Sequence, residues 1–178
     1  MNYGQIYDCD TANGIGLRVS LFVSGCTHHC LGCFNEETWD FHYGLPYTQK
    51  TQKELIEKLS RPYIRGLTLI GGEPCEPCNQ RELLPLLMEV KLLMPSKDIW
   101  CYSGYCFEEL AFDSGSRCRC EVTDDFLSYI DVLVDGEFVL EKKDISLLFR
   151  GSSNQRLLDL PESIRAGTPV LWSPKCSE

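Results

Sequence analysis

A chain of 178 residues is long enough to bury one hydrophobic core and too short for two full-sized domains, so we predict a compact single domain. Its composition, 43% hydrophobic and 24% charged with a formal net charge of -9, is typical of a folded globular protein and not of a disordered chain. The acidic excess argues against nucleic acid or an anionic membrane as a partner, because both are bound through a basic face.

The N-terminal segment MNYGQIYDCD has no basic stretch followed by an apolar one, and no run of about 18 uncharged apolar residues occurs in the chain. We therefore expect a cytoplasmic protein without a membrane segment. In that reducing compartment the eleven cysteines are expected to be metal ligands, redox groups or buried thiols, and not disulfides.

The first predicted strand covers residues 17–23 (LRVSLFV) and ends at Ser24-Gly25, directly before a group of cysteines. A helix is predicted over residues 51–59 (TQKELIEKL), where the Thr-x-x-Glu start is typical of a capping box. The later predicted elements alternate in the same way: strand 67–70, helix 81–94, strand 98–102, helix 124–129 and strand 131–134.

This alternation predicts an α/β fold with parallel strands. Each predicted strand ends in a turn that contains glycine, at Gly25, Gly72, Gly104 and Gly136. Because ligands collect at the carboxyl ends of parallel strands, we expect these turns to line one site.

The first of these turns leads into GCTHHCLGCF, where Cys26, Cys30 and Cys33 follow a CxxxCxxC spacing. Thiolates that converge on one loop suit an iron-sulfur cluster, and three of them leave one iron of a four-iron cluster open to another ligand. Two other interpretations remain at this point. The cysteines fall at helical spacing and could be core thiols, or they could join His28 or His29 in a zinc site.

Several motifs then carry a family resemblance. CTHHCLGCFN resembles the cysteine signature of the radical S-adenosylmethionine (SAM) superfamily, and its continuation to Thr38-Trp39 is similar to the glycyl-radical-enzyme activases. Further similarity lies in the opening segment, in GGEP at residues 71–74 and in DIWCYSGY at residues 98–105. VLVDGEF at 132–138 and FRGSSNQR at 149–156 resemble the activases of anaerobic ribonucleoside-triphosphate reductases.

The resemblance implies a partial (β/α) barrel of the radical SAM type, formed by residues 1–178 as a single radical SAM domain. Within it, residues from about 113 to 120 would be a cysteine-containing insert, and residues from about 161 a C-terminal extension. The implied cofactors are one 4Fe-4S cluster with three cysteine ligands and SAM. The implied activity is reductive cleavage of SAM to a deoxyadenosyl radical, which generates a glycyl radical on another protein.

Residue roles follow from the same resemblance. Cys26, Cys30 and Cys33 would hold the catalytic cluster. The other expected SAM contacts lie in the turns after the strands: Gly32 and Phe34 near the adenine, Gly71 and Gly72 with their carbonyls at the ammonium, Glu73 through its charge, and Ser103 and Asp135 as hydrogen-bonding groups. A core position for Phe34 and a solvated turn for Glu73 are the alternatives. Arg150, Asn154 and Gln155 form a polar loop that could bind the SAM carboxylate, receive the partner or simply turn at the surface.

Six cysteines lie outside the resemblance: Cys75, Cys78, Cys101, Cys106, Cys118 and Cys120. Cys75-x-x-Cys78 with Cys118-x-Cys120 could bind zinc or a second cluster, but we predict scattered reduced thiols.

The expected partner is the large subunit of an anaerobic ribonucleoside-triphosphate reductase, with a reducing donor such as flavodoxin. Two alternatives remain: an activase of another glycyl radical enzyme such as pyruvate formate-lyase, and a non-catalytic metal-binding or electron-carrying module.

Overall fold

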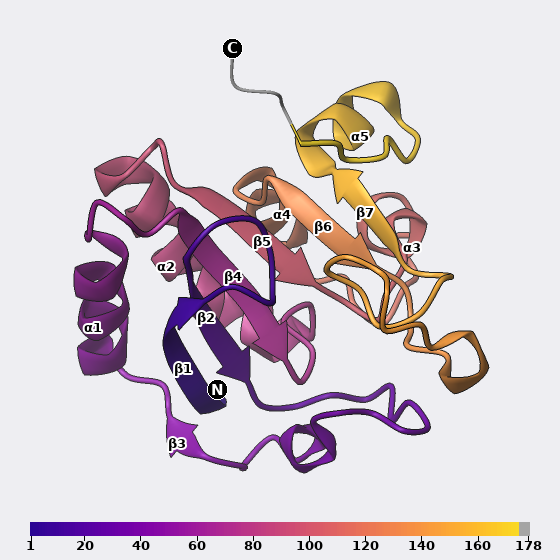
Figure 1. The fold of residues 1–178 in the computed structure, drawn as a ribbon, viewed down its shortest axis with the longest axis horizontal. Helices are drawn as coiled ribbons and strands as arrows, with labels where there is room; N and C mark the ends of the chain where they lie inside the picture. The colour runs from indigo at the N-terminus through magenta and orange to yellow at the C-terminus, as the bar shows by residue number, and fades with distance from the viewer. Residues whose placement is uncertain (175–178) are drawn as a thin grey trace.

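The computed structural model describes residues 1–174, which form one mixed α/β unit with a seven-stranded sheet and five α-helices (Figure 1). The strands are β1 (Asn2–Asp10), β2 (Arg18–Val23), β3 (Leu45–Pro46), β4 (Gly66–Gly71), β5 (Asp98–Tyr102), β6 (Val132–Asp135) and β7 (Arg156–Asp159). The helices are α1 (Gln49–Leu59), α2 (Pro77–Leu93), α3 (Phe107–Ala111), α4 (Thr123–Ser128) and α5 (Leu160–Ala166), with short 3₁₀ turns η1 (Glu36–Trp39) and η2 (Leu140–Lys142).

The centre of the sheet is parallel, as predicted, with β2, β4, β5 and β6 as neighbours in that order. β1 and β3 extend one edge and β7 the other, and all three pair antiparallel. None of these edge strands was predicted. β1 is half exposed and β3 has two residues, so neither shows the apolar run that marks a buried strand.

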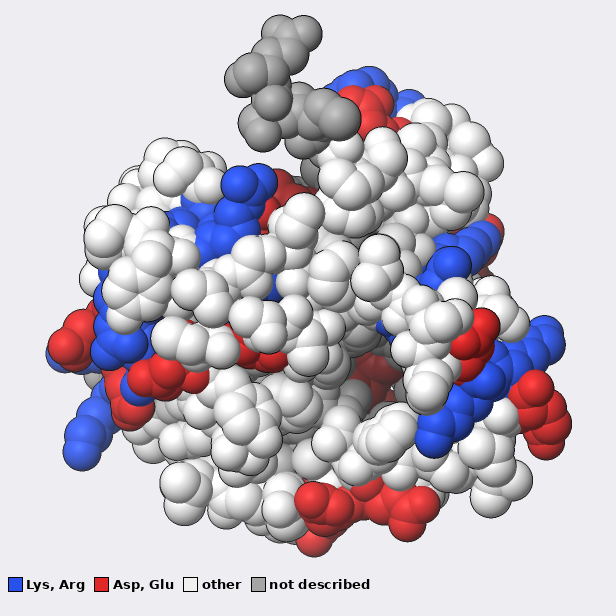
Figure 2. Space-filling model, in the orientation of Figure 1, with Lys and Arg blue, Asp and Glu red and all other residues white. Residues whose placement is uncertain are grey.

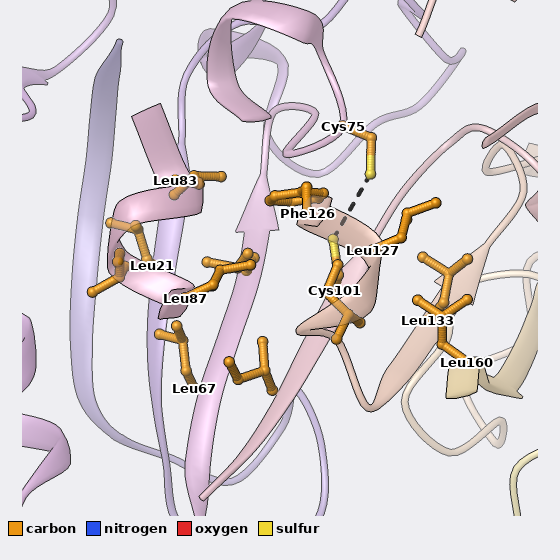
Figure 3. Close-up of a cluster of buried hydrophobic side chains, with 14 of the residues drawn as sticks. Leu21, Leu67, Cys75, Leu83, Leu87, Cys101, Phe126, Leu127, Leu133 and Leu160 are labelled. Carbon is orange, nitrogen blue, oxygen red and sulfur yellow. Dashed lines mark hydrogen bonds between the residues drawn. The ribbon is translucent and has the colours of Figure 1, made fainter. Parts of the chain in front are cut away.

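The core lies between the sheet and the helices. Paired residues place Leu21, Leu69, Cys101 and Leu133 in one row across the four parallel strands, each fully buried. Leucines of α2 and apolar residues of α4 and α5 pack against this row (Figure 3). Burial of the alternate strand positions is what holds the parallel strands in this register.

Two of the three predicted helix starts differ from the structure by two residues or more, and the third, at residue 124, lies one residue after the start of α4. The capping box of α1 joins Thr48 and Thr51, so Thr51 is the third helical residue and the predicted Thr-x-x-Glu box is wrong. α2 begins at Pro77, four residues before the predicted start at Arg81, because proline is well suited to the first helical position, where its missing N–H costs no hydrogen bond.

The predicted insert at 113–120 and the predicted extension from 161 both contribute to the fold. Residues 113–120 form a loop between α3 and α4, and the Gln80 side chain of α2 donates to the Cys118 carbonyl at 2.7 Å. The segment after 160 contains α5. Among the described helices even the longest, α2 with 17 residues, is too short and too polar for a membrane crossing.

Residues 11–17 cross the other face of the sheet (Figure 1). Aromatic side chains, among them Trp100 and Trp172, pack on the same face. Arg18 is fully buried there, lies 5.2 Å from the Trp100 ring, and donates to Thr68 at 2.6 Å and to Asp98 at 2.5 Å. This layer of paired and packed side chains closes one end of that face.

We predict that Asp98→Ala lowers the free energy of unfolding by about 3 kcal/mol or more, because it leaves the buried Arg18 charge without its carboxylate. Arg65→Ala is the matched control, since the largely exposed Arg65 binds the same Asp98 at 2.8 Å and its loss should cost less than about 1 kcal/mol. Urea denaturation under reducing conditions measures both; equal losses would contradict this account.

Candidate active site

A cavity of about 470 Å³ opens at the carboxyl ends of the four parallel strands. Figure 2 shows this face hollowed right of centre, with acidic atoms visible inside and mostly uncharged side chains around the opening. Loops after β2, β4, β5 and β6 all contribute to its wall. Eight of the predicted site residues line it: Cys26, Cys30, Cys33, Phe34, Gly71, Gly72, Glu73 and Ser103.

The loop with the three cysteines is held mainly through its backbone. The N–H groups of Gly25 and Cys26 donate to the carbonyls of Thr38 and Trp39, at 2.8 and 3.2 Å. His29 has a φ of 53°, in the left-handed region that only few non-glycine residues adopt, and its ring stacks on Trp39 at 4.6 Å. Strain of this kind persists where the surroundings fix it, and it is frequent at functional sites.

The local structure contradicts the core-thiol interpretation and does not favour a single zinc ion. Residues 26–33 form turns and not a helix, so Cys26, Cys30 and Cys33 do not share a helix face. A tetrahedral zinc ion would hold sulfur atoms about 3.8 Å apart. Within residues 1–174 these three thiols do not belong to any group of three or more ligand atoms that all lie within 4.8 Å of one another. A wider spacing around one cavity suits a cluster with several irons.

Burial disfavours the thiolate form of two of the three cysteines. Burial raises the pKa of Cys26 to about 12, and burial also raises the pKa of Cys30 above its ordinary value. A metal centre binds thiolates, so its assembly has to release these protons. Cluster assembly should therefore be favoured by mildly alkaline conditions.

The Glu73 side chain is buried in the site and accepts three hydrogen bonds. It is 1% exposed, and its Oε1 accepts from the Cys75 N–H at 2.8 Å and from the Ser103 hydroxyl at 2.9 Å. Its Oε2 accepts from the Gly104 N–H at 2.7 Å. The solvated-turn alternative for Glu73 is therefore wrong, because the carboxylate is buried and joins the loops after β4 and β5.

The two glycines before Glu73 allow the loop after β4 to approach the cysteine loop. Gly71 has a φ of 110°, and a Cβ on Gly72 would lie 2.7 Å from the Gly25 carbonyl oxygen. Gly72 donates to the Val23 carbonyl at 2.7 Å, and Glu73 donates to the Gly25 carbonyl at 2.8 Å. A side chain at position 72 has no room between these backbones.

His28 was considered in the sequence only as a zinc ligand, but its ring nitrogens face carboxylates. Nδ1 lies 2.7 Å from Glu137 Oε1, and Nε2 lies 3.1 Å from Glu73 Oε2. The second contact is not aligned as a hydrogen bond and acts through charge. Burial lowers the pKa of His28, but hydrogen bonding and the charges of Glu73 and Glu137 outweigh it, so the pKa is raised above its ordinary value.

Asp135 and Gly32 lie next to the cavity and not in its wall, whereas Phe34 is part of the wall. Asp135 is fully buried and accepts from the Phe107 N–H and from Arg156, so its carboxylate is already paired. Gly32 lies against Leu140. Phe34 is 74% exposed at the opening, which makes the core alternative for it wrong.

Four side chains of the cavity wall have a buried polar atom without a hydrogen-bond partner among the described residues. These atoms are Nε2 of His28, Nε1 of Trp39, the hydroxyl of Tyr102 and Nε of Arg150. Unpaired buried polar groups are costly and are expected where a polar ligand completes them. Arg150 had been noted in the sequence. Tyr102 had not, because only the strand register shows that it faces the cavity and not the helices.

The extra cysteines do not form a second metal site within the described residues. Cys75 and Cys101 are buried with sulfurs 3.9 Å apart (Figure 3), and Cys78 is exposed. The one close group of ligand atoms there contains Cys106, Glu108 and Asp135, and the Arg156 guanidinium already pairs with both carboxylates.

Residues 12–158 match the family model of a 4Fe-4S single cluster domain. A protein of Pasteurella multocida is 46% identical over 157 residues, which cover 87% of this chain and 95% of that protein, and it is named an anaerobic ribonucleoside-triphosphate reductase-activating protein. The chain belongs to this family of activating proteins. Proteins with the same name from Enterobacteria phage T4 and Escherichia coli are 46% and 43% identical, over 88% and 87% of this chain and 93% and 96% of their own lengths.

For this activating-protein family member we predict that Gly72→Ala lowers the free energy of unfolding by about 1–3 kcal/mol, because the new methyl group pushes against the Gly25 carbonyl. It should also lower iron uptake during reconstitution. Gly115→Ala is the control, since a Cβ there meets only one side-chain atom at 3.4 Å. Urea denaturation and iron analysis give the two results; a Gly72→Ala protein that matches Gly115→Ala in both would contradict the proposed close approach.

Proposed function

We propose that this protein is an activase that binds a 4Fe-4S cluster through Cys26, Cys30 and Cys33, cleaves SAM reductively and generates the glycyl radical of an anaerobic ribonucleoside-triphosphate reductase. One observation carries the proposal. The three thiols, the Gly71-Gly72 turn and Ser103 share one cavity, in a chain whose relatives are named activating proteins of that reductase. The 4Fe-4S family match supports the cluster.

When bound, the cluster would supply the electron that splits SAM into methionine and a deoxyadenosyl radical, which takes a hydrogen atom from a glycine Cα. The protein's part is to bind, orient and protect. Because Cys26, Cys30 and Cys33 would be the only cysteine ligands, one iron would be free for the amino and carboxylate groups of SAM. The carbonyls of Gly71 and Gly72 would accept from the ammonium, with the negative charge of Glu73 next to them.

The other predicted contacts have defined places in this proposal. The Ser103 hydroxyl would hydrogen-bond the methionyl or ribosyl group, and Gly32 and Phe34 would lie near the adenine at the opening. The Asp135 carboxylate is paired with Arg156, so Asp135 would position the loop after β6 and would not contact SAM itself. Arg150, with its free Nε in the wall, is suited to the SAM carboxylate.

Part of the cavity wall is apolar, which suits a site that has to keep water away from its ligand. Apolar side chains of the sheet and of the later loops line it: Phe22, Ile70, Phe138, Leu147 and Phe149. Such a surface excludes water from the space around the ligand. The polar atoms that remain are those that a charged, polar ligand would engage.

We extend the proposal to the fold, the partners and the location. The four consecutive parallel strands support a partial (β/α) barrel of the radical SAM type. Residues 1–178 would form one radical SAM domain, with 113–120 as an insert and the part from 161 as an extension. The electron donor would be a flavodoxin-like protein and the location the cytoplasm, where free cysteines such as the close pair Cys75 and Cys101 stay reduced.

The chemistry is tested by anaerobic reconstitution with iron and sulfide, reduction, addition of SAM and chromatography for methionine and deoxyadenosine. We predict that Cys26→Ala, Cys30→Ala and Cys33→Ala each abolish both products, because each removes a cluster ligand. Cys78→Ala is the control, since Cys78 is exposed and lies outside the cavity wall. Continued SAM cleavage by the Cys30→Ala protein would refute the proposal. If the parent protein holds a complete, reduced cluster and still leaves SAM uncleaved, an electron-carrying module is favoured.

The partner is tested by electron paramagnetic resonance after the loaded protein is mixed with a glycyl radical enzyme. A glycyl radical signal is expected on the large subunit of an anaerobic ribonucleoside-triphosphate reductase and not on pyruvate formate-lyase. A signal on pyruvate formate-lyase and not on the reductase would identify a different protein substrate, while the proposed SAM chemistry would stand.

A further inference from the structure

The His28 side chain joins three loops that come from different strands. It lies in the loop after β2, and its two ring nitrogens face Glu137 after β6 at 2.7 Å and Glu73 after β4 at 3.1 Å. The His28 side chain is 4% exposed and that of Glu73 1%. A single ring therefore connects the cysteine loop, the glycine turn and the segment that closes the cavity on the β6 side.

The surroundings fix the orientation of this ring. It packs edge-to-face on Tyr105, with ring centroids 4.3 Å apart, and a Cβ on Gly104 would lie 2.7 Å from the ring. The ring cannot turn away from the two carboxylates without displacing these neighbours. Its position is thus set by packing as well as by charge.

His28 also completes the set of partners around Glu73. Three donors, Cys75, Ser103 and Gly104, already bind the Glu73 carboxylate. The His28 Nε2 lies 3.1 Å from Oε2 without hydrogen-bond alignment, so it adds to these three bonds through charge. Removal of the imidazole would leave the negative charge of the buried Glu73 carboxylate less well balanced, and water could then bind the exposed oxygen.

Attachment of the cysteine loop itself does not depend on His28. Gly25 and Cys26 are held by the carbonyls of η1, and Cys33 donates to the Cys30 carbonyl at 3.1 Å. These bonds stay when the imidazole is removed. The backbone of the turn after β4 also reaches this loop, through the Glu73 N–H and the Gly25 carbonyl at 2.8 Å. The His28 contacts add a second tie, further along the cysteine loop, and extend it to Glu137.

We propose that His28 is a positioning residue that clamps the cysteine loop to Glu73 and Glu137, and so fixes the spacing between the cluster and the Gly71-Gly72 carbonyls that receive SAM. This inference rests on the function proposed above. It assigns His28 to SAM binding and not to cluster assembly, and it makes Glu137 part of the same clamp.

The test compares His28→Ala with the conservative His28→Gln, which can still reach towards Glu73, and with His42→Gln as control for an exposed histidine. His28→Ala should keep the iron content of the parent protein while its KM for SAM rises about tenfold, the effect of one charge-assisted hydrogen bond. kcat should change less, and the effect of SAM on the electron paramagnetic resonance spectrum of the reduced cluster should weaken. His28→Gln should recover part of the loss, and His42→Gln should match the parent protein.

Glu137→Gln provides a second variant that is expected to fold, because the Glu137 side chain is 56% exposed. It should raise KM in the same direction, and the double variant with His28→Ala should add little further, because both changes break one clamp. An unchanged KM and spectrum in His28→Ala, or loss of iron from that variant, would overturn the assignment.

Hydrogen exchange on the cluster-free protein separates this inference from the proposed function. Faster exchange at residues 72–75 and 136–139 in His28→Ala is expected if the clamp exists, whether or not the protein cleaves SAM. Unchanged exchange would refute the clamp. Absence of SAM cleavage in the parent protein would instead refute the proposed function.

Discussion

The Glu73 carboxylate lies where the loops after β2, β4 and β5 meet, and the rest of the site depends on the burial of this charge. An isolated charge at 1% exposure would be very unfavourable, so the carboxylate can exist there only with its full set of partners. Those partners come from loops that are far apart in the sequence, and each is correctly placed only when the parallel strands are in register. The folded sheet and the assembled site are therefore one cooperative structure.

Much of this arrangement could be predicted from the sequence, because the central strands carry local signals. Apolar runs that end at glycine mark β2, β4, β5 and β6 to within about one residue, and parallel order then brings their carboxyl ends together. The cysteines and the GGE turn are recognisable because their residue types have specific chemistry. β7 was not predicted, since its four residues become a strand only by pairing with β6.

The features that could not be predicted depend on contacts between distant residues. His28 and Glu137 are separated by 109 positions, and no local pattern relates them. Tyr102 lies next to the buried Cys101 on the same strand, and only the register decides that one faces the cavity and the other the helices. Cys101 itself occupies an apolar row between Leu69 and Leu133, so the high cysteine content reflects in part the use of cysteine as a small hydrophobic residue.

The layer around Arg18 and Trp100 determines which part of this sheet face is open. Both side chains are at most 1% exposed and neither lines the cavity, so the face is closed there and the cavity lies beside the cysteine loop. Phe34, in the wall of the cavity, is 74% exposed. Under the proposed function, the protein substrate would therefore dock over the same loops that bind SAM, and the surface that recognises the reductase would also cover the nucleotide.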